Sequence, residues 1–254
     1  MPPTWPSGRQ KCRGWIVESI GSRGPCFILC LHHRNSPRRP RMTDFPISLL
    51  NGYQDFRDKR YAHENERYRK LAESGQSPET LVIACCDSRA APETIFNAVP
   101  GEIFVVRNVA NLVPPYAPDD QHHSTSAALE FAVQSLKVKH IVVMGHGRCG
   151  GIHAALNPSV EPLSPGDFIG KWMELLGPAT EAISANRWST PAERQKMLEL
   201  ASIRFSIANL RTFPCVSILE KKERLTVHGV WFDISEGKLW VMEPATEDFR
   251  PIAS

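Results

Sequence analysis

The chain has 254 residues, 42% of them hydrophobic and 22% charged, a composition typical of a globular protein with a buried core, and no apolar run is long enough to predict a membrane span. The net charge of +3 divides into +7 for residues 1–41, which hold eight basic residues and one acid, and −4 for the rest, so the body lacks the basic surface of a nucleic-acid-binding protein. Seven scattered cysteines in a chain of this length argue against a small disulfide scaffold and favour reduced thiols in a cytoplasmic protein, some of them free to bind a metal.

Residues 1–41 differ from the rest of the chain because they are rich in Pro, Arg and Gly and lack a clear periodicity. They could form a disordered arm or a targeting peptide, although their prolines disfavour the amphipathic helix of a targeting sequence. A third alternative, which we favour, is that translation starts at Met42. On that interpretation residues 1–41 are a mis-assigned extension whose three cysteines take no part in the chemistry, and residues 42–254 form a single domain.

The first half of the body predicts one long helix followed by strands. A helical pattern extends from Phe45 to about Ser74, where Gly75-Gln76-Ser77-Pro78 breaks it. Short apolar runs predict three strands buried on both faces, as in a parallel sheet, at residues 81–84, 102–107 and 140–144. Helices are expected between and after these strands, with a short one opening at Ala91-Pro92-Glu93 and another over residues 124–136.

The second half predicts more helices and a final hairpin. Helices are expected just after Gly151, over residues 171–186 and over residues 190–211, the last opening with the capping-box spacing Thr190-Pro191-Ala192-Glu193. Residues 225–234 and 238–242 are typical of a terminal β-hairpin. The alternation of strands and helices predicts an α/β fold with a parallel central sheet.

Two chemically informative segments come directly after predicted strands, Cys85-Cys86-Asp87-Ser88-Arg89 and His146-Gly147-Arg148-Cys149. Taken singly, a buried cysteine is usually an inert core residue and a histidine after a strand is often a hydrogen-bonded core residue. Parallel packing would set the two segments side by side at the carboxyl edge of the sheet, where sites form. Two thiolates and an imidazole suit zinc, and three protein ligands leave the open position of a catalytic site.

Cys85 is a better candidate ligand than Cys86, because successive residues of an extended segment point to opposite faces. Cys85 shares a face with Asp87, whereas Cys86 is expected to pack away from the site as a plain core residue. Cys149 precedes Gly150-Gly151 at a predicted helix N-terminus, where the helix dipole is expected to favour the thiolate.

Asp87 has two possible roles beside such a metal. It could bind the ion as a fourth ligand and close the site, or it could accept a hydrogen bond from a metal-bound hydroxide and orient it. Arg89 would favour the second role if its guanidinium pairs with both carboxylate oxygens and holds them off the metal. A surface ion pair of little consequence is the alternative.

These two segments match the signatures of the β-carbonic anhydrases, and the resemblance covers roughly residues 50–245. The chain is most similar to the plant-like subclass, through the stretches Gly75–Pro78, Gly101-Glu102, Phe104–Asn108, Ala110–Tyr116 and Leu136-Lys137-Val138. The resemblance implies one zinc ion per chain, held by Cys85, His146 and Cys149, and an orienting dyad of Asp87 and Arg89. It also implies a mostly parallel sheet flanked by helices and an obligate dimer, or a higher even homo-oligomer, whose N-terminal helix wraps the partner.

The resemblance further implies a substrate pocket at the subunit interface. Gln76 occupies the position of a glutamine that the neighbouring chain donates to the substrate, and Phe104 occupies that of a pocket phenylalanine. Phe131 stands where the subclass has a tyrosine, which removes a hydroxyl but keeps an apolar wall. The Trp–Arg–Tyr set that binds a regulatory bicarbonate in the other subclass is not found, and Gln76 favours an open, unregulated site.

The implied reaction is the reversible hydration of CO₂ to bicarbonate and a proton. Zinc-bound hydroxide, oriented by Asp87, would attack CO₂ beside the two phenylalanines, while Gln76 and a backbone N–H near Gly150 stabilise the developing charge. His122 and His123 are candidate proton shuttles, although two exposed loop histidines are the simpler interpretation.

Three other functions stay open at this point. A carbon disulfide or carbonyl sulfide hydrolase on the same scaffold would share the zinc ligands. A structural or redox-sensing zinc protein is disfavoured by the absence of a fourth Cys or His. A phosphate-binding loop at Gly145–Gly151 is disfavoured because the segment lacks a Gly-Lys-Ser/Thr ending.

Overall fold

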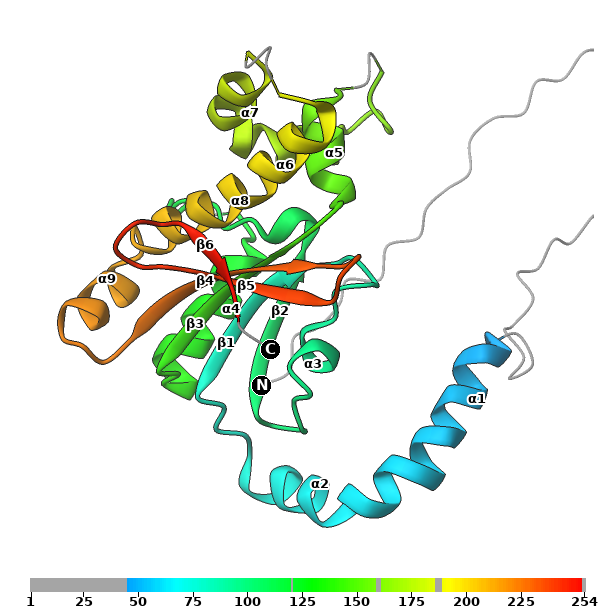
Figure 1. Ribbon diagram of the computed structural model, residues 1–254. Coiled ribbons are helices and arrows are strands. Elements are labelled where there is room, and N and C mark those ends of the chain that lie inside the picture. Colours follow the sequence, from blue (N-terminus) through cyan, green and yellow to red (C-terminus); the bar gives the residue numbers. More distant parts are fainter. Residues whose placement is uncertain (1–44, 120, 159–160, 186–188, 253–254) are drawn as a thin grey trace, which may run out of the picture. The chain divides into compact units, whose positions relative to one another are not determined.

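The computed structural model describes residues 45–119, 121–158, 161–185 and 189–252 (Figure 1). The chain divides into two compact units, Met1–Tyr53 and Gln54–Ser254. The predictions made for residues 1–41 lie outside the described residues. In the first unit the described residues belong mainly to the start of helix α1 (Ile47–Asp55), where several apolar side chains are exposed, among them Phe45, Ile47, Leu49 and Tyr53.

The second unit opens with helix and then enters the sheet. A π-helical turn η2 (Phe56–Tyr61) and helix α2 (Ala62–Ser74) follow α1, as the helical pattern predicted. The helix ends at Gly75, whose φ of 77° is a left-handed conformation that suits glycine. None of the helices in the described part of the chain is long and apolar enough to cross a membrane.

Six strands of the described part of the chain form one mostly parallel sheet in the order β2-β1-β3-β4-β5-β6, which confirms the predicted α/β class. The strands are β1 (Thr80–Cys85), β2 (Ile103–Asn108), β3 (His140–His146), β4 (Thr226–Asp233), β5 (Lys238–Met242) and β6 (Phe249–Pro251). β2, β1, β3 and β4 pair in parallel, and β4, β5 and β6 pair antiparallel. The predicted terminal hairpin is therefore present, and it extends the parallel sheet at one edge.

Helices connect the strands and cover the sheet (Figure 1). They are α3 (Pro92–Ile95), the 3₁₀ turn η3 (Val109–Asn111), α4 (Ser124–Glu130), the π-helical turn η4 (Phe131–Leu136), α5 (Gly150–Leu156), α6 (Phe168–Met173), the 3₁₀ turn η5 (Glu174–Leu176), α7 (Gly177–Ser184), α8 (Pro191–Leu210) and α9 (Pro214–Lys221). The capping box predicted for α8 is present, with the Thr190 side chain accepting from the Glu193 N–H and Glu193 accepting from the Thr190 N–H.

The alternation of side chains along the strands divides the core. Leu81, Ile83 and Ile141 pack on one face of the sheet with α8, whereas Val82 and Met144 pack on the other. A third apolar cluster lies among α5, α6, α7 and α8 and includes the side chains of Cys85, Leu112, Cys149, Ile152, Leu176 and Leu198. Two of the candidate ligands are thus part of a dry cluster at one end of the sheet.

Helix α9 and strand β6 were not predicted from the sequence. No helix was expected between the one predicted over residues 190–211 and the terminal hairpin, but Pro214 is the first residue of α9 (Pro214–Lys221). β6 has only three residues and includes Pro251, which a short edge strand tolerates but which gives no alternating pattern to detect.

Candidate metal centre

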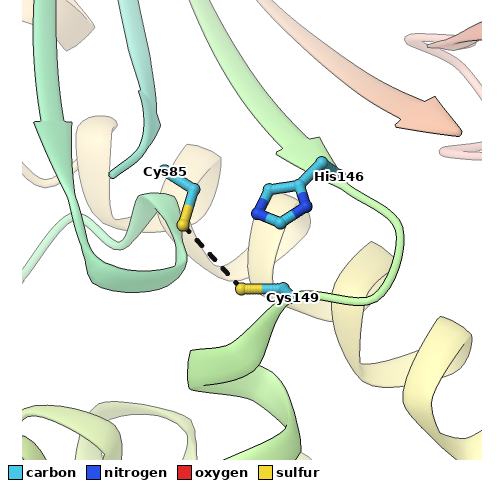
Figure 2. Close-up of side chains that lie close together, drawn as sticks. All are labelled: Cys85, His146 and Cys149. Atoms are coloured by element: carbon cyan, nitrogen blue, oxygen red, sulfur yellow. Dashed lines mark hydrogen bonds between the residues drawn. The ribbon is translucent and has the colours of Figure 1, made fainter. Parts of the chain in front are cut away.

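Three side chains that bind metals converge in one buried place at the edge of the sheet (Figure 2). Cys85 is the last residue of β1, His146 is the last residue of β3, and Cys149 immediately precedes α5. Their ligand atoms all lie within 4.8 Å of one another, and the two sulfur atoms are 3.9 Å apart. The structure thus brings the three candidate ligands together.

The local fold explains this convergence. β1 and β3 are adjacent and parallel, so both strands end at the same edge of the sheet. After His146 the chain turns at Gly147, whose N–H donates to the Phe232 carbonyl at 2.8 Å. Arg148 follows with a left-handed φ of 56°, and this reversal returns Cys149 to the strand ends.

His146 presents a ring nitrogen that the described residues leave without a partner. The residue is 1% exposed, and its Nδ1–H donates to the Gly147 carbonyl at 2.9 Å. The other nitrogen, Nε2, is buried with no hydrogen bond from the described part of the chain. Because an unpartnered buried polar atom is costly, this nitrogen indicates a ligand beside the two sulfurs.

The two thiols are in contact, and the contact shifts their pKa values in opposite directions. The Cys85 and Cys149 sulfurs are within hydrogen-bonding distance, and this contact lowers the pKa of Cys85 to about 4 against the opposing effect of burial. The same hydrogen bond, with burial and the neighbouring negative charge, raises the pKa of Cys149. The N–H groups of Gly151 and Ile152 at the start of α5 act to lower the pKa of Cys149, as the predicted helix N-terminus would, but the contact with Cys85 and burial outweigh them while the pair shares a proton. A divalent cation would displace that proton.

This set of donors fits zinc. Cysteine sulfur and histidine nitrogen are the ligands zinc prefers, and within the described ranges no other group of His, Cys, Asp or Glu offers three donors so close together. Structural zinc sites have four protein ligands, whereas a site with three keeps a position for water or substrate.

Asp87 lies beside this position and is engaged by Arg89. Arg89 Nε donates to Oδ1 at 2.9 Å and Nη2 donates to Oδ2 at 2.8 Å, and the Arg89 N–H adds a bond to Oδ1 at 2.9 Å. These hydrogen bonds hold the pKa of Asp87 well below its usual range. Asp87 Oδ2 is 3.9 Å from His146 Nε2, and Arg89 Nη2 also donates to the Arg148 carbonyl at 3.2 Å. The dyad therefore joins the two segments that supply the metal-binding side chains.

Arg107 is a contributor to the site that the sequence analysis missed. From β2 its Nε donates to the Cys85 carbonyl at 2.8 Å and its Nη2 donates to the Asp87 carbonyl at 2.7 Å. It thereby holds the backbone on both sides of Cys86. The one sequence signal was a charged residue in an otherwise apolar strand, which does not reveal what the side chain contacts.

Three residues predicted to contact substrate lie away from the metal-binding side chains of their own chain. Gln76 precedes β1, at the end of that strand opposite to Cys85. Phe104 pairs with Leu81 in β1, which places it about 13 Å along the sheet from Cys85. Phe131 packs on Phe104, with ring centroids 5.8 Å apart, and is 49% exposed.

The remaining candidates are also placed by the structure. Cys86 is exposed, so the prediction that it packs in the core is wrong: β1 ends at Cys85, and none of the described elements covers the side chain that follows. Gly150 is the first residue of α5 and has open space where a Cβ would be. His122 is exposed, and His123 pairs with Asp119 at 2.7 Å.

Comparisons with known proteins agree with this picture. The family model for carbonic anhydrase matches residues 80–239. A carbonic anhydrase of Pseudomonas aeruginosa is 34% identical over 205 residues, covering 81% of this chain and 91% of its own. Beta carbonic anhydrase 3 of Arabidopsis thaliana is 35% identical over 200 residues, covering 77% of this chain and 76% of its own.

Solved structures give the same result. The β-carbonic anhydrase CcaA superimposes with a TM-score of 0.75 at 27% identity, covering 82% of this chain and 92% of that protein. One of two tetrameric β-carbonic anhydrases of Sordaria macrospora superimposes with a TM-score of 0.66 at 32% identity, covering 77% of this chain and 95% of that protein.

Proposed function

The chain belongs to the β-class carbonic anhydrases, and from this premise we propose that Cys85, His146 and Cys149 hold its zinc ion. The enzyme hydrates CO₂ reversibly to bicarbonate and a proton, and zinc is its cofactor. The observation that best supports the ligand assignment is the buried Nε2 of His146, which is unpartnered among the described residues and lies beside two sulfurs in contact.

Asp87 and Arg89 orient the nucleophile. When bound, zinc supplies Lewis-acid activation of water at neutral pH. Asp87 accepts a hydrogen bond from the attacking oxygen and fixes its direction, while Arg89 keeps both carboxylate oxygens occupied and off the metal. This pairing supports the open-site, plant-like arrangement rather than one in which Asp87 closes the site.

The substrate pocket is completed by a second copy of the chain. Three of the predicted pocket residues are too far from Cys85 of their own chain to contact a substrate there, namely Gln76, Phe104 and Phe131. The Phe131 ring is exposed, and a partner chain would bury it. All six residues of β2 are half-buried, which is consistent with further burial against a partner. We assign these three residues to the partner's site, with Gln76 donating to a substrate oxygen and the two rings forming a dry wall.

Gly150 supplies the backbone donor of the same pocket. Its N–H belongs to the first turn of α5, where backbone N–H groups lack intrahelical acceptors, and the described residues leave open space at the position of a Cβ. Substrate charge that develops next to Cys149 would be stabilised there.

The proposal extends to the domain organisation, the oligomeric state and the cellular compartment. Residues 42–254 form one catalytic domain, with the N-terminal helix wrapping the partner. The assembly is a dimer or a higher even homo-oligomer, as in the tetrameric relative of Sordaria macrospora. We place the enzyme in the cytoplasm, because Cys85, Cys86, Cys149 and Cys215 are free thiols. Its ligands are small molecules, not nucleic acids or membranes.

Stopped-flow CO₂ hydration with a metal assay tests the ligand assignment. The purified protein should contain about one zinc per chain and hydrate CO₂ rapidly, and Cys149→Ala should lose both properties. Zinc without hydration from neutral to alkaline pH would contradict the assignment, and a parallel assay with carbon disulfide and carbonyl sulfide would identify a sulfur-substrate hydrolase.

Mixed assemblies test the shared pocket. A co-purified heterodimer of a Cys149→Ala chain and a Gln76→Ala chain should regain one intact site, because the Cys149→Ala chain still supplies Gln76 to its partner. Each homodimer should stay impaired. If Gln76 served its own chain, the heterodimer would have no intact site and would show no recovery.

A further inference from the structure

Behind the metal centre, helix α8 buries a carboxylate whose partners are all neutral donors. Glu199 is 2% exposed. Its Oε1 accepts from the Cys149 N–H at 3.1 Å and from the Gln195 amide at 2.8 Å, and its Oε2 accepts from the Trp231 indole N–H at 3.2 Å. Burying a carboxylate is costly even when it is hydrogen-bonded, and this burial raises the pKa of Glu199.

Gln195 bonds to the carbonyl of Cys149, the residue whose N–H donates to Glu199. It lies one turn before Glu199 on the same face of α8, and its Nε2 donates to the Cys149 carbonyl at 3.0 Å. The N–H and the C=O of Cys149 are therefore both bonded to side chains of one helix, and those two side chains are bonded to each other.

The position of Cys149 explains why such bonds matter. The residue follows Arg148, which is held at a left-handed φ of 56°, and it begins only the short helix α5. A cavity of about 540 Å³ lies beside this turn and is lined in part by Gly147, Arg148 and Gly150, so packing supports the turn weakly on that side. Polar bonds to the Cys149 backbone therefore help to set the direction of its sulfur, beside the apolar cluster in which the side chain packs.

We infer that Glu199 and Gln195 form a positioning pair that fixes Cys149 in the direction needed to bind the metal. The inference rests on the proposed assignment of Cys149 as a zinc ligand. Both side chains bond to the backbone of the ligand, so they act as positioning residues. Trp231 connects the pair to β4, and its ring lies 3.1 Å from where a Cβ of Gly147 would be, so the whole turn from Gly147 to Cys149 is braced against one helix and one strand.

The test compares zinc release and cobalt spectra among four variants. Glu199→Gln keeps the size of the side chain but places a donor where a carboxylate oxygen accepted, and Gln195→Ala removes the bond to the Cys149 carbonyl. Glu193→Gln is the matched control on the same helix, because glutamine also fits a capping box. Ser202→Ala is the control for a general loss of stability, since it removes a buried hydroxyl of α8 that accepts from Asn111 and donates to the Glu199 carbonyl.

The zinc-loaded proteins are mixed with an excess of a chromogenic chelator, and the release rate is measured beside the melting temperature. We expect release about 10-fold faster in Glu199→Gln and Gln195→Ala than in the unmodified protein, Glu193→Gln or Ser202→Ala. Replacing zinc with Co²⁺ should show weakened thiolate-to-cobalt charge-transfer absorption in the first two variants only. Because Gln195 is only part-buried, its variant remains informative even if Glu199→Gln folds poorly.

Two results would overturn the inference. Release rates within twofold of the unmodified protein in both Glu199→Gln and Gln195→Ala would show that the pair does not position the ligand. An equal acceleration in Ser202→Ala at a similar melting temperature would show that the pair only stabilises the fold. Failure of the ligand assignment itself is recognised separately, because Cys149→Ala would then still bind one zinc per chain.

Discussion

Strand β3 begins and ends with a histidine, and the two residues have opposite surroundings. His140, at the amino end, has its Nδ1 2.7 Å from the Thr226 hydroxyl, which also lies 2.9 Å from Nε2 of His228. His146, at the carboxyl end, is buried, and its Nε2 has no partner among the described residues. A hydroxyl thus satisfies His140 at one end of the strand, whereas His146 at the other end keeps a nitrogen available for a metal.

The two edges of the sheet differ in the same way. At the amino edge the polar side chains are partly exposed and pair with one another, as in the ion pair of Glu79 and Lys139. At the carboxyl edge α5 and α8 close an apolar cluster around Cys85 and Cys149. Because burial removes water as a partner, a polar atom left over at this edge indicates a ligand. The metal centre is therefore marked by an unmet hydrogen-bonding need as well as by the residue types of its ligands.

The largest expected effect comes from replacing the histidines at the two ends of β3, one at a time. His146→Ala should lose zinc and reduce CO₂ hydration to near background, because two sulfurs alone hold the ion poorly. His140→Gln should keep about one zinc per chain and near-normal turnover. Metal analysis and stopped-flow assays on both proteins check this, and full zinc occupancy in His146→Ala would break the comparison.

At the same edge, Asp87→Asn should separate metal binding from turnover. The amide cannot accept as a carboxylate does, and it places a donor against Arg89, so the nucleophile loses its orientation. We expect zinc content to be unchanged and kcat to fall on the order of 10²-fold, as for other misaligned reactants. Turnover close to normal would remove the orienting role from Asp87.

A smaller effect is expected from the arginine that holds the backbone around Cys86. Arg107→Met removes both bonds to the Cys85 and Asp87 carbonyls and should lower zinc affinity or activity by about 10-fold. Arg204→Met is the matched control, because Arg204 also donates through Nε and Nη2 to a backbone carbonyl, that of Glu247, on the surface. Equal losses of zinc affinity or activity in the two variants would show that the bonds from Arg107 to the Cys85 and Asp87 carbonyls have no special importance for the site.

The smallest effect is expected at the amino edge and concerns pH. Burial, assisted by His140, lowers the pKa of His228, so the unfolded chain binds a proton at that residue more readily than the folded chain. Stability from this residue is therefore full above its ordinary pKa of 6.5 and is lost as the pH falls below that value towards the lowered pKa. In His228→Gln the melting temperature should depend less on pH below 6.5. An unchanged dependence would contradict the assignment of this pH effect to His228.

Much of the fold could be predicted because its signals are local. The apolar runs that became β1 and β3 carry β-branched residues and end in chemically distinct segments, so both the strands and their functional edge were detectable. The capping box at Thr190 and the glycine that ends α2 were equally visible. Elements with weak local signals, α9 and β6, were missed for the same reason.

The sequence by itself determined the α/β class and the residue types of a three-ligand zinc centre, because strand pattern and ligand chemistry are properties of short segments. Only the tertiary structure decided that Cys85 and Cys149 come into contact, that Cys86 is exposed and that Gln76 lies at the far end of β1. The contacts that hold the ligands join residues far apart in the chain, as Arg107 does with Cys85 and Glu199 with Cys149. Such contacts depend on which strands and helices become neighbours, and no local pattern specifies them.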